Sequence, residues 1–111
     1  MAKEKEARGG LGEMAAQVQR LQAQLVQAQA ELAEETVEAS AGGGAVRVVM
    51  SGTQECRSVT ISPQLLCEEE AELLQDLVIL AVNQAVQESR LLAARKLGPL
   101  SGPAAGATRN P

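Results

Sequence analysis

The spacing of apolar residues along this chain changes twice, and these changes constrain the fold more than any other feature. Between residues 11 and 35 the apolar positions recur at alternating intervals of four and three, which is typical of a helix that packs along one narrow stripe. Between residues 37 and 61 apolar and polar residues alternate, as in half-buried strands. Helical spacing returns over residues 68–97. This order predicts an α+β fold with a long N-terminal helix, a three-stranded antiparallel meander and a long C-terminal helix.

The stripe on the first predicted helix, called here the heptad seam, consists of Met14, Val18, Leu21, Leu25, Ala28 and Leu32. A helix of this length would extend about 37 Å. Strands as short as those predicted would extend only about 20–25 Å. The first helix is therefore expected to project beyond the sheet.

Two turns divide the predicted sheet, one at glycines 42–44 and one at residues 52–54. Glycine adopts a positive φ at little cost, so a run of three suits a tight turn. In the third strand Cys56 lies three residues before Val59 and is therefore out of phase with it. A β-bulge near residues 57–58 would return both side chains to one face of the sheet.

The ends of the chain differ in composition from its middle. Residues 1–10 are expected to be a flexible segment, residues 11–97 the folded domain and residues 98–111 a disordered tail. Gly98-Pro99 is a helix-stop signal, and a tail rich in Gly, Pro, Ala and Ser cannot bury enough apolar surface to fold. The chain has neither an apolar run of about 18 residues nor the apolar core of a secretory signal, so no membrane contact and a cytoplasmic location are expected.

The second predicted helix carries a wider apolar arc than one sheet and one narrow seam can cover. The simplest partner for the remainder is a second copy of the chain, so a homodimer is expected. Six residues of this arc are candidates for the dimer interface: Leu73, Leu74, Val78, Leu80, Val82 and Val86.

Catalytic chemistry has little support in this composition. The chain has no His, Phe, Tyr or Trp, so general acid–base catalysis by histidine and aromatic stacking of bases are both absent. Two cysteines without a histidine cannot complete a tetrahedral zinc site. We therefore expect a protein that is not an enzyme and that has no metal, cofactor or small-molecule substrate.

The formal net charge is −4, but the charges are unevenly distributed. Five acids and no base lie between Glu68 and Asp76, whereas four bases and no acid lie between Ser89 and Pro111. The basic side chains could be solvated or matched to helix dipoles, and Arg47 and Arg57 could pair with Glu38 and Glu55. As candidates for contact with DNA phosphates, the sequence offers Lys3, Lys5, Arg8, Arg20, Arg90, Arg95 and Lys96.

Two segments, GGGAVRVVMSGTQECRSVTISPQLL (residues 42–66) and EEEAELLQDLVILAVNQAVQESR (residues 68–90), follow the heptad helix in a distinctive order. Over about residues 11–97 the chain closely resembles the YbaB/EbfC family of bacterial nucleoid-associated proteins. The resemblance implies a homodimer of helix–sheet–helix subunits, shaped like tweezers, that binds DNA through protruding helices. It also implies a non-enzymatic protein of the cytoplasm and nucleoid, with a role in nucleoid organisation and gene regulation.

Two other functions fit the same pattern of elements. In the first, the heptad seam recruits another protein, and the chain is a dimeric interaction adaptor with no direct DNA contact. In the second, helix–hairpin–helix architecture indicates a prefoldin-like holdase, although prefoldin arms require longer heptad runs than this chain has.

Overall fold

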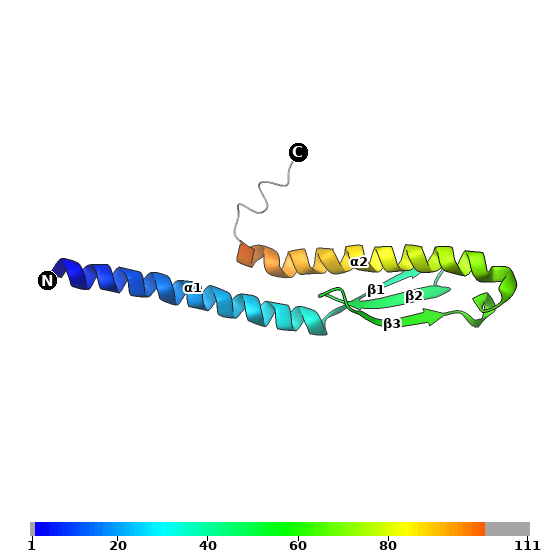
Figure 1. The fold of residues 1–111 in the computed structure, drawn as a ribbon, viewed down its shortest axis with the longest axis horizontal. Helices are drawn as coiled ribbons and strands as arrows, with labels where there is room; N and C mark the ends of the chain where they lie inside the picture. The colour runs from blue at the N-terminus through cyan, green and yellow to red at the C-terminus, as the bar shows by residue number, and fades with distance from the viewer. Residues whose placement is uncertain (1, 102–111) are drawn as a thin grey trace, which may run out of the picture.

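The computed structural model describes residues 2–101, in which two long helices flank a small sheet (Figure 1). The elements in chain order are α1 (Ala2–Glu34), β1 (Thr36–Ala41), β2 (Val46–Ser51), β3 (Cys56–Ile61), the 3₁₀ turns η1 (Pro63–Leu65) and η2 (Glu68–Glu70), and α2 (Ala71–Ser101). This arrangement confirms the predicted α+β fold.

The sheet is antiparallel with strand order β1-β2-β3, as the alternation predicts. Glycines 42, 43 and 44 form the first turn with φ values of 65°, 68° and 94°, a run that only glycine adopts easily. In the pairing of β2 with β3, Val49 lies opposite Ser58 and Met50 opposite Cys56, which leaves Arg57 as the extra residue. The predicted β-bulge is therefore present.

The core lies between α2 and the first two strands. Val46, Val48 and Met50 point from β2 toward α2, where the small residues Ala81 and Ala85 are completely buried. Small side chains on the helix let it approach the sheet closely, which compensates for the absence of aromatic residues. The Ser89 hydroxyl, also buried, donates a hydrogen bond of 2.7 Å to the backbone oxygen of Ser51 and ties α2 to the end of β2.

Both helices extend further than the sequence predicts. α1 begins at Ala2 and continues through glycines 9, 10 and 12, so the described part of the predicted flexible segment, residues 2–10, is helical. Each glycine in a helix costs about 1 kcal/mol, but the surrounding Ala, Glu, Lys and Gln are strong helix formers. α2 passes Gly98-Pro99 and ends at Ser101, with one backbone donor missing in its last turn. The rest of the predicted disordered tail, residues 102–111, lies outside the described residues.

The end of α1 is fixed to the β2–β3 turn by the backbone of Gly52. Its N–H donates to the carbonyl oxygens of both Leu32 and Glu35, at 3.0 Å each. A Cβ atom at Gly52 would lie 2.5 Å from the Leu32 side chain and 2.8 Å from the Leu32 oxygen. From this junction α1 projects well past the sheet, as predicted, and the molecule measures 83 × 32 × 16 Å (Figure 1).

Gly52→Ala is expected to destabilise the fold, because the added methyl group would force α1 away from the turn. Overpacking of this kind costs about 1–3 kcal/mol. The measurement is the free energy of unfolding from urea denaturation. Gly12→Ala is the matched control, since a Cβ there meets nothing within 4 Å and an alanine strengthens the helix. Equal stability of the two variants would contradict the proposed role of Gly52.

Candidate nucleic-acid interface

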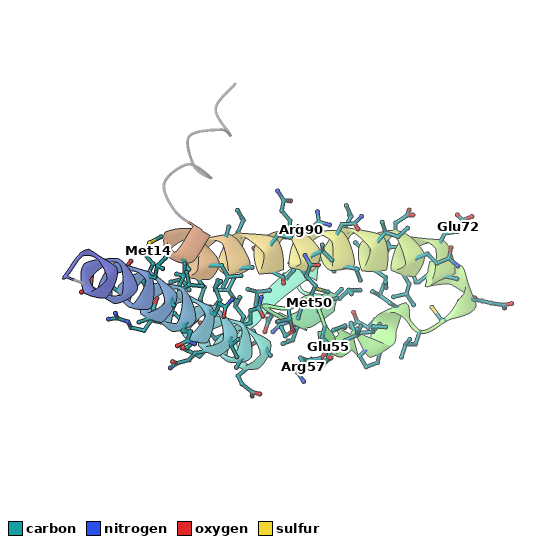
Figure 2. The ribbon with its side chains drawn as sticks, turned by 60° about the vertical axis from the view of Figure 1, so that its left-hand side comes forward. Met14, Met50, Glu55, Arg57, Glu72 and Arg90 are labelled. Carbon is teal, nitrogen blue, oxygen red and sulfur yellow. The ribbon has the colours of Figure 1, made fainter. Side chains whose placement is uncertain are left out.

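The densest acidic cluster of the molecule lies away from most of its basic candidates along the long axis. The acidic cluster that runs from Glu68 to Asp76 covers η2 and the first turns of α2, at one end (Figures 1 and 2). The last turns of α2 and the projecting part of α1 point toward the other end (Figure 1). The fold therefore places the basic candidates of both helices away from this acidic cluster, although α1 also carries Glu13, Glu31 and Glu34, Glu35 directly follows α1, and α2 carries Glu88.

Arg90 and Arg95 are exposed on α2, and neither side chain makes a hydrogen bond or ion pair with another of the described residues. Five helical residues correspond to a rotation of about 140° from one another, so the two guanidinium groups face different sides of α2. Arg90 lines a groove of about 400 Å³ together with Gln29 of α1 and Gln54 of the β2–β3 turn. Arg95 lines a separate hollow of about 300 Å³ beside Val37 of β1.

Lys96, by contrast, is engaged within the subunit. Its ammonium group lies 2.6 Å from a carboxylate oxygen of Glu35 and 3.5 Å from one of Glu31, so it bridges α2 to the end of α1. The hydrogen bond to Glu35 and the charges of both carboxylates raise the pKa of Lys96 above its ordinary value of 10.5. Lys96 is thus a poor candidate for a phosphate contact. The sequence around Lys96 did not indicate that Glu31 and Glu35 would be its partners.

The remaining basic residues differ in whether their side chains have partners in the subunit. Arg20 is exposed on the projecting part of α1 and has no side-chain partner among the described residues. Arg47 lies 3.9 Å from Glu38 across the β1–β2 pair. Arg57 lies 3.1 Å from Glu55 and also donates a hydrogen bond of 2.7 Å to the Ala33 oxygen (Figure 2). The interpretation of these two arginines as ion-paired is confirmed. Lys3, Lys5 and Arg8 belong to α1, but their side chains lie outside the described part of the structure.

The predicted dimer-interface residues occupy two different positions on α2. Leu74, Val78, Val82 and Val86 are half-buried against the core of their own subunit. Leu73 and Leu80 are exposed, and Leu91 extends the same side of the helix. Apolar surface also remains on β3, where Val59 is 47% exposed although it pairs with the fully buried Val48. α2 lies over β1 and β2, which leaves this part of the sheet face uncovered.

The described residues form neither a metal-binding cluster nor a membrane-spanning helix. Cys56 and Cys67 are both exposed free thiols. No cluster of three or more potential metal ligands occurs among residues 2–101. Neither of the two long helices, over its described length, is apolar enough to cross a membrane.

The fold and its charges define a helix–sheet–helix protein with one acidic end and exposed arginines away from that end. Comparison with known sequences identifies its family. The profile of the YbaB/EbfC DNA-binding family matches residues 8–104, and the chain belongs to this family. It is 45% identical over 94 residues to a nucleoid-associated protein of Desulforamulus reducens, covering 85% of this chain and 90% of that one. It is 46% identical over 90 residues to a nucleoid-associated protein of Nocardia farcinica, covering 81% and 82%.

A solved structure shows the same fold. The crystal structure of an uncharacterized protein from Helicobacter pylori superposes with a TM-score of 0.72 at 19% identity, covering 80% of this chain and 94% of that one.

Alkaline pH is expected to weaken the junction between α1 and α2. The folded pKa of Lys96 is raised, so the ion pairs contribute fully below pH 10.5 and are lost as the pH rises through the folded value. The midpoint of urea denaturation should therefore fall above pH 10.5, and it should fall less in Lys96→Met. Lys96 is the sole lysine beyond residue 5 and the chain has no tyrosine, so few other groups titrate there. An equal decline of the denaturation midpoint in the wild type and in Lys96→Met would contradict this assignment.

Proposed function

We propose that this chain is a nucleoid-associated protein that binds DNA as a homodimer, with a role in nucleoid organisation and gene regulation in the cytoplasm and nucleoid. In this proposal the basic ends of the helices contact DNA phosphates. The observation that carries it is membership of a DNA-binding family together with exposed arginines that are unpaired among the described residues and lie away from the acidic cluster.

Phosphate contact by arginine needs a guanidinium group that is accessible and free of carboxylates. Arg90 and Arg20 meet both conditions within the described residues, whereas Lys96 is paired with two carboxylates. Arg95 is exposed and makes no ion pair among the described residues, although Glu88 lines the same hollow. Lys3, Lys5 and Arg8 would add charge at the tip of α1. A dimer doubles each contact, and each phosphate that is neutralised releases counterions into the solution. The sequence has no helix-turn-helix or zinc-finger pattern and no aromatic residue on which bases could stack, so we expect modest or shape-based specificity.

A homodimer is supported by the apolar surface that one subunit leaves exposed. Leu73, Leu80 and Leu91 lie along one side of α2 and are 46–60% exposed. The buried side of α2 faces the sheet of its own subunit. No other described element of the chain covers the side that carries these leucines. A second copy would bury both surfaces at once through a twofold axis.

Removing the free arginines is expected to weaken DNA binding and its dependence on salt. In Arg90→Ala/Arg95→Ala, the slope of log affinity against log salt concentration should fall by about one unit for each phosphate that the protein no longer neutralises. Because the two residues face different sides of α2, the single variants should contribute unequally. Affinity is measured by mobility shift with the same duplex over a range of salt concentrations.

Two single variants serve as controls, and each removes the same charge as one of the single arginine variants. Arg47→Ala and Lys96→Ala each remove one positive charge from a residue that is paired with carboxylates in the subunit. Both should retain the wild-type salt slope. An unchanged slope in the double arginine variant, or an equal reduction in the controls, would contradict the assignment of phosphate contacts. No DNA binding at low salt would favour the interaction adaptor instead.

Polar substitution on the exposed side of α2 is expected to weaken the dimer. Leu73→Gln/Leu80→Gln removes apolar surface without disturbing the core, since both side chains already contact solvent. Sedimentation should show the wild type as a dimer at micromolar concentration and the variant shifted toward monomer. Gln75→Ala, a substitution of an exposed polar residue on a different side of α2, should leave the mass unchanged. A wild-type monomer would refute the dimer.

A further inference from the structure

The projecting half of α1 carries an apolar stripe that nothing in the described structure covers. The heptad seam extends one position toward the N-terminus, to Leu11. Along this half of it, Leu11, Met14, Val18 and Leu21 are 67%, 63%, 54% and 43% exposed. Figure 2 shows Met14 on the part of α1 that extends away from the sheet.

The same seam is an established packing surface in its C-terminal half. Ala28 and Leu32 are 7% and 2% exposed, and Leu25 is half-buried at the boundary. Leu32 packs beside Gly52 and lines a groove with Ala93 and Leu97 of α2. α2 then ends at Ser101, while α1 continues without a partner (Figure 1). The exposed half of the heptad seam is therefore continuous with the half that packs inside the subunit.

The residues that flank the exposed seam indicate which partner fits. In a heptad helix, charges at the flanking positions select the partner and repel wrong ones. Here those positions hold Gly10, Ala15, Gln17, Gln22 and Gln24, all of them uncharged. Between residues 11 and 25 the two charged side chains, Glu13 and Arg20, lie outside these flanks. Such a surface neither attracts a charged partner nor repels a copy of itself.

The chain itself offers no other segment to cover the seam. Residues 102–111 contain alanine and proline as their apolar residues and no Leu, Val, Ile or Met. The exposed leucines of α2 lie beside the sheet and not along the projecting half of α1. The remaining candidate is α1 of another copy, which offers the same apolar spacing.

We propose that the exposed heptad seam of α1 pairs with the same seam of a second copy, antiparallel, so that Leu11 of each copy lies level with Leu21 of the other. In this register Met14 lies level with Val18. The antiparallel direction keeps the two folded bodies at opposite ends of the helix pair, whereas a parallel pair would bring them to the same end. Pairing through α1 is separate from the proposed α2 interface and would join dimers into larger assemblies.

A matched pair of valine substitutions tests the seam. Val18→Glu places a charge in the seam, and Val26→Glu places the same charge on the same helix at a position that is 67% exposed and outside the seam. Sedimentation of the full chain without DNA, over micromolar to submillimolar concentration, is the measurement. The wild type and Val26→Glu should form a species larger than any that Val18→Glu forms. The same size distribution in all three proteins would overturn the proposal.

The α2 variant separates this proposal from the proposed dimer. Leu73→Gln/Leu80→Gln, which shifts toward monomer at micromolar concentration, should form a seam-paired dimer at submillimolar concentration, and adding Val18→Glu should abolish that dimer. If Leu73→Gln/Leu80→Gln removes all self-association and Val18→Glu removes none, the seam does not bind itself and the proposal fails. Because DNA is absent, failure of the DNA-binding proposal would leave these results unchanged.

Disulfide formation tests the direction of the pair. In a background of Cys56→Ser and Cys67→Ser, both exposed positions, chains with Met14→Cys and chains with Val18→Cys are mixed and mildly oxidised. The antiparallel register predicts that the mixed disulfide dominates over either same-residue disulfide. Predominance of a disulfide between two copies of Val18→Cys would overturn the antiparallel assignment.

Discussion

The last turn of α1 is attached to the rest of the subunit by three contacts of different kinds, and the arrangement of the molecule depends on them. The backbone N–H of Gly52 donates to the Leu32 and Glu35 oxygens, Arg57 donates to the Ala33 oxygen, and Lys96 bridges Glu31 and Glu35. These contacts come from the β2–β3 turn, from β3 and from α2. They fix the direction in which α1 leaves the sheet, although α1 buries few side chains of its own.

That direction gives the molecule its two unlike ends. α2 runs back over β1 and β2, so its acidic first turns and its basic last turns lie at opposite ends of the sheet, and α1 projects beyond the basic end (Figure 1). A negatively charged protein can thereby present exposed arginines away from its acidic cluster. One of the basic candidates is engaged in this junction, since Lys96 forms ion pairs with Glu31 and Glu35.

The absence of aromatic residues explains why so much apolar surface remains outside. The core is built from Val, Met, Leu and Ala, and Ala81 and Ala85 bring α2 close to the sheet. Close approach gives good packing over β1 and β2 but leaves Val59 on β3 half exposed. The exposed side of α2 and the exposed heptad seam are therefore consequences of one small core, and both are suited to contacts between copies.

Local patterns in the sequence determined the elements and their order. The out-of-phase Cys56 predicted the β-bulge, the three glycines predicted the first turn, and the heptad spacing predicted the projecting helix, because each of these depends on neighbouring residues alone. Helix ends were less predictable, since Gly9-Gly10 and Gly98-Pro99 weaken a helix without ending it. Only the tertiary structure decided which cations are free. Glu35 and Lys96 meet because the sheet turns the chain back on itself, and that geometry is not encoded in the spacing of either residue's neighbours.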